Sequence, residues 1–223
     1  MRRLISFLLA VGALQAAEQP PASLMITYQC MPADRPALRK AMLDSGLARF
    51  QHWQEAGVLR SFLILFSRHV NSGRWDMLAL LHFADSTKVD RWSEIEKWWP
   101  AGLAKEELSL LTDVRTGMVD LVQQNAGADP PEKPVFVVTP LSFEQPSQAL
   151  GRLQASLAAQ AERWLAGKAV TLSEAFLSRP PGDMAYVVQE FDNEEAFEKS
   201  PPLTPPNGAA QGEPVVAEVL LAR

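Results

Sequence analysis

The residues best suited to proton transfer lie on one apolar stretch, residues 75–85 (WDMLALLHFAD). If this stretch is a strand, its side chains alternate between two faces, and Asp76 and His82 fall on the same face. A neutral imidazole in an apolar cavity can accept a proton or orient a ligand. We therefore predict that His82 is a catalytic base assisted by Asp76 or Arg68. The competing interpretation is a hydrogen-bonded structural histidine at a strand end.

Further polar residues are candidates for ligand binding. Thr27 and Gln29 alternate with apolar residues in a predicted first strand. The pairs Ser67-Arg68 and Ser178-Arg179 follow two predicted strands at equivalent positions. If the two halves are related by a pseudo-twofold axis, Arg68 and Arg179 could bind one anionic group through guanidinium hydrogen bonds. Solvent-exposed strand ends are the simpler alternative.

Several common kinds of site are not indicated. The sequence contains no metal-ligand spacing, no phosphate-binding loop, no G-x-S-x-G and no dinucleotide-binding fingerprint. His69 and His82 are too far apart along one hairpin to share a metal ion, so we expect neither a metal nor a cofactor. Cys30 is the single cysteine, which excludes an intrachain disulfide and favours a buried core thiol.

The elements that must position these residues are predicted in the order β-α-β-β-α-β, the ferredoxin-like arrangement. Strands are indicated by β-branched and apolar runs, helices by apolar periodicity, and their ends by proline, glycine and Asn-Ser-Gly signals. In the first half, strands are predicted at 24–31, 60–69, 75–85 and 114–122, and helices at 36–56, from 85 or 86 to 99, and at 105–111.

A Pro/Gly-rich segment at 125–134 is predicted to link two copies of this unit, 18–124 and 135–223. Corresponding positions recur at nearly constant spacing, as in Trp53 with Trp164 and Asp76 with Asp183, which favours a duplication. In the second half, strands are predicted at 135–141, 171–178, 184–191 and 215–222, helices at 146–167 and 193–199, and irregular structure at 200–214.

In element order, and in the strand WDMLALLHFAD that leads into an acidic helix start, the chain resembles the dimeric α+β barrel superfamily in its tandem form. The resemblance implies an α+β fold in which two ferredoxin-like sheets pack face to face around a cavity. Families in this group include cofactor-free monooxygenases, stress-responsive proteins, haem-binding enzymes and proteins of unknown role. The tandem haem enzymes place an iron-ligating histidine in the C-terminal half. This chain has no histidine after His82, so we expect no haem.

The N-terminus resembles an export signal, predicted over residues 1–17. Arg2 and Arg3 precede an apolar run at 4–14, and small residues follow it. A run of about 11 residues is shorter than the ~20 needed to span a bilayer, which favours a cleaved signal over a membrane anchor. The mature chain is predicted to be periplasmic or secreted, without stable membrane insertion. A net charge of −5 argues against nucleic acid or anionic membranes as partners.

The sequence supports two alternative hypotheses about function. The first is an exported protein that binds a small, mostly apolar molecule between its repeats, with cofactor-free monooxygenase-like or isomerase-like activity if it is an enzyme. The second is a non-catalytic interaction or scaffold protein whose contact surface is the Trp-rich second helix, carrying Trp92, Trp98 and Trp99. These tryptophans could also lie in the core or join copies of the chain as a homo-oligomer.

Overall fold

The structure is a computed structural model that describes residues 22–70, 74–127, 131–167, 170–180 and 182–222. The predicted signal segment, residues 1–17, lies outside the described residues. The elements of the first half are β1 (Ala22–Cys30), α1 (Arg35–Ala41), a π-helical turn (Met42–Gly46), α2 (Leu47–Glu55), β2 (Ser61–Ser67), β3 (Met77–Phe83), α3 (Ser86–Glu96), a 3₁₀ turn (Pro100–Gly102), α4 (Lys105–Leu108) and β4 (Leu111–Ala126).

The second half repeats this order with one additional short strand. Its elements are β5 (Val135–Phe143), α5 (Pro146–Ala166), β6 (Val170–Ser178), β7 (Met184–Phe191), α6 (Glu194–Lys199), β8 (Ala209–Gln211) and β9 (Val215–Ala222). Strand β8 lies in the segment 200–214 that was predicted to be irregular, and it pairs with the end of β5.

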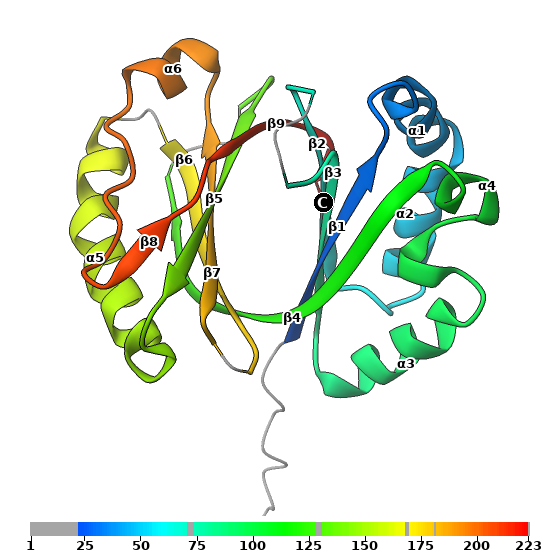
Figure 1. Cartoon of the computed structure of the whole chain (residues 1–223), viewed down its shortest axis with the longest axis horizontal. Coiled ribbons are helices and arrows are strands. Elements are labelled where there is room, and N and C mark those ends of the chain that lie inside the picture. Colours follow the sequence, from blue (N-terminus) through cyan, green and yellow to red (C-terminus); the bar gives the residue numbers. More distant parts are fainter. Residues whose placement is uncertain (1–21, 71–73, 128–130, 168–169, 181, 223) are drawn as a thin grey trace, which may run out of the picture.

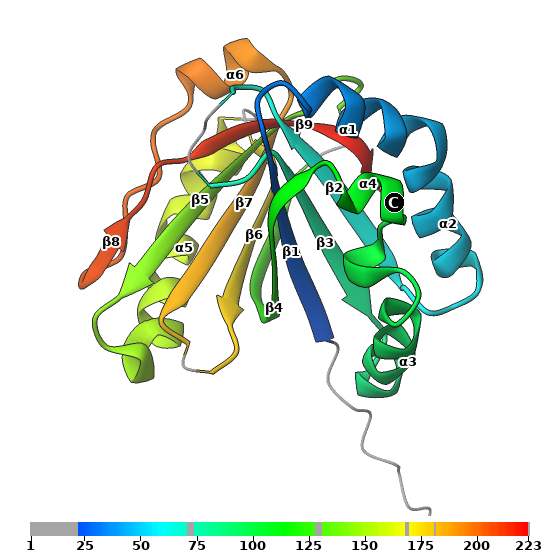
Figure 2. The ribbon, with the colours of Figure 1, turned by 45° about the vertical axis from the view of Figure 1, so that its right-hand side comes forward.

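The strands form a closed antiparallel barrel, which confirms the predicted α+β fold (Figure 1). The strand order is β7-β6-β4-β1-β3-β2-β9-β5-β8, and pairing of β7 with β5 closes the ring and leaves β8 outside it. Helices α1 to α4 lie outside one half of the barrel and α5 lies outside the other, as Figure 2 also shows.

The last strand of each half joins the two sheets. Strand β4 pairs with β1 and then with β6, and β9 pairs in the same way with β2 and β5. This double pairing explains why β4 has 16 residues and extends into the predicted linker at 125–134. In Figure 1 the two strands cross between the sheets on opposite sides of the ring.

From Met77 onward, the side chains of β3 alternate between two faces of the sheet, as predicted. Met77, Ala79 and Leu81 pack in the core between the first sheet and its helices. Leu78 and Leu80 pack inside the barrel. The barrel interior is filled in its middle by buried apolar side chains from both halves, including Met25, Leu63, Leu65, Phe136, Phe176, Val188 and Val215. The two sheets therefore share a core, and open space is left towards the barrel ends.

Helix α3 begins at an N-cap that the sequence indicated. The carboxylate of Asp85 accepts hydrogen bonds from the backbone N–H groups of Thr87 and Lys88. The helix was predicted to extend to residue 99 and to carry Trp92, Trp98 and Trp99. This prediction is wrong, because α3 ends at Glu96. Trp92 is fully buried, whereas the side chain of Trp98, beyond the helix end, is 84% exposed.

Among the described residues, no helix has both the length and the apolar character needed to cross a membrane.

Candidate functional site

The polar candidates on β1 and β3 divide between two ends of the barrel interior. Ser23 pairs with His82, Met25 with Leu80, and Thr27 with Leu78. Met25 and Leu80 are buried, and they form an apolar layer between the other two pairs. Thr27 and Gln29, which were predicted to bind a ligand, do not line the cavity beside His82. They line a different cavity.

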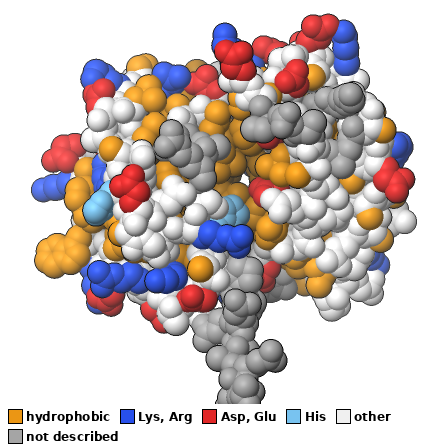
Figure 3. Space-filling model, turned by 180° about the vertical axis from the view of Figure 1, so that it is seen from behind, with side chains coloured by type: hydrophobic (Ala, Val, Ile, Leu, Met, Phe, Trp, Pro, Cys, Tyr) orange, Lys and Arg blue, Asp and Glu red, His pale blue; other side chains and the backbone are white. Residues whose placement is uncertain are grey.

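The cavity beside His82 has a volume of about 360 Å³. Apolar side chains contribute to its wall, and its polar lining consists of Ser23, Arg60, Ser61, His82, Asp120, Gln124 and Glu174. Figure 3 shows the molecule hollowed between its two halves, with histidine and basic side chains in the hollow. Because β4 and β6 supply Asp120, Gln124 and Glu174, the two halves build this cavity together.

His82 is held at the end of β3 by a neighbour on β1. Its Nδ1 atom lies 3.0 Å from the Ser23 hydroxyl oxygen, and its ring centroid lies 5.9 Å from that of Phe176. Burial, assisted by the positive charge of Arg60, lowers the pKa of His82 to about 4. The imidazole is therefore neutral at neutral pH. The serine occupies Nδ1 and leaves Nε2 as the ring nitrogen available to a ligand.

Glu174 is a site residue that was not predicted. It is buried, and the side-chain amide of Gln124 donates a hydrogen bond of 2.7 Å to its Oε1 atom. Burial raises the pKa of Glu174, and the charge of Glu190 raises it further. Burial also raises the pKa of Glu190. The signal was present in the sequence, because Glu174 interrupts the apolar alternation of β6 on the face that carries Phe176.

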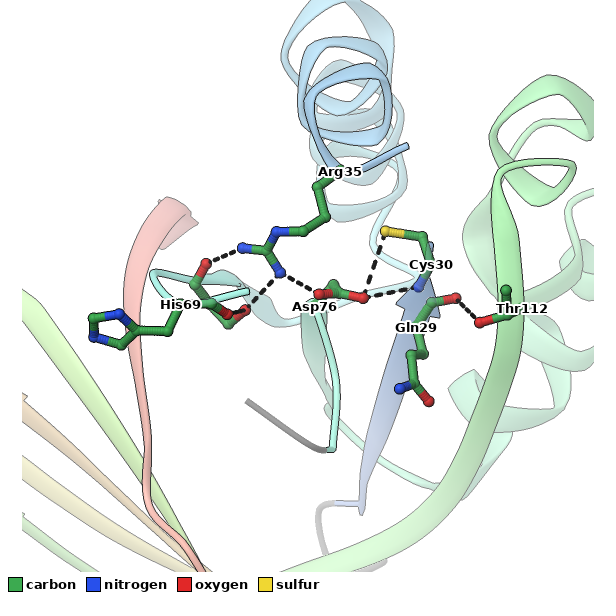
Figure 4. Close-up of polar contacts among 7 residues, drawn as sticks. Gln29, Cys30, Arg35, His69, Asp76 and Thr112 are labelled. Carbon is green, nitrogen blue, oxygen red and sulfur yellow. Dashed lines mark hydrogen bonds and ion pairs between the residues drawn. The ribbon is translucent and has the colours of Figure 1, made fainter. Parts of the chain in front are cut away.

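Asp76 is a structural residue, and its predicted role beside His82 is wrong. Its carboxylate accepts a hydrogen bond of 2.8 Å from the backbone N–H of Cys30 and forms an ion pair with Arg35 of α1 (Figure 4). Regular alternation begins only at Met77, where β3 begins. Trp75, which precedes Asp76, packs in the barrel interior, while Asp76 is bound to a residue of the helical layer.

Arg35 fixes the start of α1 to the sheet through several contacts. Its guanidinium donates to the hydroxyl of Ser67 at 3.0 Å and to the carbonyl of Ser67 at 2.6 Å, and it lies 4.9 Å from the ring centroid of Phe66. Cys30 is buried beside Asp76, and burial together with that carboxylate raises the pKa of the thiol to about 12. The thiol is therefore protonated and unreactive at neutral pH, as a core cysteine should be.

Arg68 and Arg179 do not form a shared anion site, so that prediction is also wrong. Arg68 forms an ion pair of 3.1 Å with Glu194, and Arg179 binds Asp120 through Nε and Nη2 at 2.8 and 2.6 Å. The backbone of Arg68 bonds to β9 and that of Arg179 bonds to β4. These strands lie on opposite sides of the ring (Figure 1). Arg179 instead orients Asp120, which lines the His82 cavity.

The described part of the chain shows no metal centre. There, no group of three or more His, Cys, Asp or Glu side chains is arranged to hold a metal ion.

Comparison with known proteins establishes the fold. No family model and no curated protein matches the sequence. A proposed monooxygenase from Lactobacillus acidophilus matches with a TM-score of 0.62 and 10% identity, over 92% of this chain and 96% of its own. An anthrone oxidase-like protein matches with a TM-score of 0.60 and 12% identity, over 93% and 94% of the two chains.

A mutant chlorite dismutase from Candidatus Nitrospira defluvii, in complex with cyanide, has a TM-score of 0.52 and 12% identity over 91% of both chains. The likeness extends over nearly the whole described chain in each case. At these identities it shows the fold alone, which is an α+β barrel, as the sequence indicated.

Proposed function

We propose that this chain binds a small, mostly apolar molecule in the His82 cavity and acts on it by proton transfer without a cofactor. The observation that carries this proposal is a neutral imidazole, fixed by Ser23, in the wall of a cavity built by both halves. Apolar lining from Ala22, Phe83 and Leu121 suits an apolar substrate body, and the polar groups suit one reacting end.

The proposed chemistry begins with transfer of a proton from an acidic C–H or O–H group to Nε2 of His82. Arg60 lines the same cavity, and its positive charge favours the substrate anion that this step forms. Return of the proton to another atom completes an isomerisation. Alternatively, an anion formed from a CH2 group adds dioxygen, the oxidant, at carbon and takes up a proton to give a hydroperoxide, which loses water to leave a carbonyl group. Glu174, whose pKa is raised, is suited to return a proton.

The structural neighbours support this choice by analogy. A proposed monooxygenase and an anthrone oxidase-like protein share the barrel. Their sequences are too different for residue roles to be transferred, so the assignment of His82, Arg60 and Glu174 rests on the cavity of this chain.

Native mass spectrometry of the protein purified from its own host tests ligand binding directly, because it reports the mass of a co-purified molecule and the assembly state together. The same measurement on H82A is expected to show loss of the ligand, whereas H69A, which changes an exposed histidine, is expected to retain it. Unchanged binding and turnover in H82A would exclude the proposed role of His82.

Export is part of the proposal and is supported by the N-terminal sequence, in which Arg2 and Arg3 precede the apolar run at 4–14. N-terminal sequencing of the protein from a periplasmic or culture-medium fraction tests it. Cleavage after Ala16 or Ala17 is the expected result, and an uncleaved protein in the membrane fraction would contradict it.

A second candidate function rests on Trp98, whose side chain is 84% exposed. Tryptophan is enriched among the residues that carry most of the binding energy at protein interfaces. On this proposal the chain is an interaction protein, or forms a homo-oligomer, through the region after α3. W98A would then abolish partner binding or self-association with little effect on folding. Unchanged association in W98A would exclude this surface.

A further inference from the structure

A second cavity, of about 430 Å³, lies at the other end of the barrel interior. Its lining includes Thr27, Gln29, Arg74, Arg115, Trp75 and Tyr186, with Val138, Pro140 and Glu213. The layer formed by Met25 and Leu80 separates Thr27 from the Ser23–His82 pair on the same faces. Occupation of one cavity therefore does not require occupation of the other.

Arg74 is positioned by a close approach of the backbone at Gly212. A Cβ atom at residue 212 would lie 2.8 Å from Nη2 of Arg74 and 3.0 Å from Cγ of Pro140. A larger residue at this place would force the guanidinium to move. Arg74 lines this cavity, and among the ion pairs between described residues none involves it.

Arg115 brings a second guanidinium to the same cavity. It pairs with Thr27 across β4 and β1, on the interior face. Its Nε–H donates to Asp113 at 2.7 Å, a bond that uses neither Nη nitrogen. The positive charges of Arg74 and Arg115 both act on the Tyr186 phenol, where they oppose the rise in its pKa that burial and Asp183 cause. Both guanidinium groups therefore lie within electrostatic reach of one hydroxyl.

We propose that this cavity, defined by Arg74, Arg115, Trp75 and Tyr186, is a second binding site that takes a small organic carboxylate. The Nη groups of the two arginines bind the carboxylate, a geometry that guanidinium groups favour. The apolar part of the ligand packs against Trp75, Val138 and Pro140. Glu213 is a like charge beside the ligand, so it weakens binding of a simple acid.

Titration with benzoate, followed by calorimetry and by amide NMR shifts, tests this site, and benzyl alcohol serves as the neutral probe of the same shape. Benzoate is expected to bind, and added salt is expected to weaken it. R74Q should weaken binding by about tenfold or more, since it removes charged hydrogen bonds. R115Q should weaken it less, because the side chain of Arg115 is 81% exposed and water screens its charge. G212A should weaken it by displacing Arg74 with all charges retained, and E213Q should strengthen it.

Two matched variants separate this site from the rest of the protein. R152Q changes a half-buried arginine of α5 that bonds to Gln148 and Asn207, and H82N changes the other cavity. Both are expected to bind benzoate as the wild type does. The carboxylate site can therefore be confirmed even if the proposed role of His82 is wrong. No binding of benzoate at up to about 10 mM would overturn the proposal. Equal binding of benzyl alcohol, or unchanged binding by R74Q/R115Q, would also overturn it.

Discussion

Asp76 immediately precedes β3, His82 lies near the other end of that strand, and the two side chains face different layers of the molecule. The backbone N–H of Asp76 donates to the carbonyl of Tyr28, and its carboxylate binds Arg35 of α1. His82 pairs with Ser23, at the other end of β1, and lines a cavity of the barrel interior. One residue thus holds a helix to the sheet, and the other is available to a ligand.

The buried His82 makes the stability of the protein depend on pH. Its pKa is about 4 in the folded state and about 6.5 when the chain is unfolded, so the unfolded state binds the extra proton between these values. Above about pH 6.5 the neutral His82 does not reduce the free energy of unfolding. As the pH falls towards 4, protonation of the unfolded state lowers that free energy by up to about 3 kcal/mol. Urea unfolding of wild type and H82N at a series of pH values measures this.

The comparison with H82N is essential because Glu174 and Glu190 have raised pKa values and act in the opposite direction. The free energy of unfolding of H82N is expected to fall less between pH 6.5 and 4 than that of the wild type. H69N, which changes an exposed histidine, should keep the wild-type slope. Equal slopes in wild type and H82N would mean that the folded protein protonates His82 normally.

The ion pair between Arg35 and Asp76 is predicted to be important for the free energy of unfolding. Both side chains are only 8% exposed. R35M leaves the Asp76 carboxylate buried without its cation and is expected to cost about 3–5 kcal/mol of unfolding free energy. R35M/D76N should cost less than R35M, because the uncompensated charge is gone. A larger loss in the double variant would contradict this account.

The exposed pair Arg39–Glu218 is the matched control for that experiment. Its side chains are 43% and 39% exposed, so water and salt weaken the attraction. R39M is expected to change the unfolding free energy by only about 0–1 kcal/mol. Chemical denaturation of both variants in the same buffer compares a buried ion pair with an exposed one on the same helix.

The fold was predictable because its signals are local and repeat. Apolar alternation in β3, the Asp85 cap and the recurrence of the order after residue 134 each act over a few residues, and they agree with one another. The length of β4 was not predictable in this way. Its second half is set by pairing with β6, a contact between segments about 50 residues apart in sequence.

The site was predictable only where alternation was regular. His82 lies within β3, and the period of two placed it correctly inside the barrel. Asp76 lies before the strand begins, where the period no longer applies. The partners of Arg68 and Arg179 come from other elements, so no local pattern reveals that carboxylates already bind them. Glu174 could have been found from its place on the interior face of β6.

Glu174 is expected to reduce stability at neutral pH. A carboxyl whose pKa is raised by folding costs stability when it is ionised in the folded protein, and this cost disappears as the pH falls below its unfolded value. E174Q retains an oxygen for the Gln124 amide and removes the charge. It should raise the unfolding free energy at pH 7 by about 1 kcal/mol and leave it nearly unchanged at pH 4. Destabilisation by E174Q at pH 7 would show that the ionised carboxylate is stabilised by its surroundings.

Gly102 and Gly117 are predicted to differ in how far substitution by alanine changes stability. Gly102 has a φ of +77°, and a Cβ atom there would lie 2.6 Å from Phe50 and 3.1 Å from Trp92, both fully buried. G102A therefore combines backbone strain with overpacking and should cost about 2–4 kcal/mol. Gly117 of β4 has nothing within 4 Å of such an atom, so G117A should change stability by less than about 1 kcal/mol. Thermal and urea unfolding compare the two. A tolerated G102A would mean that the turn after α3 repacks freely, and a damaging G117A would mean that the bend of β4 requires glycine.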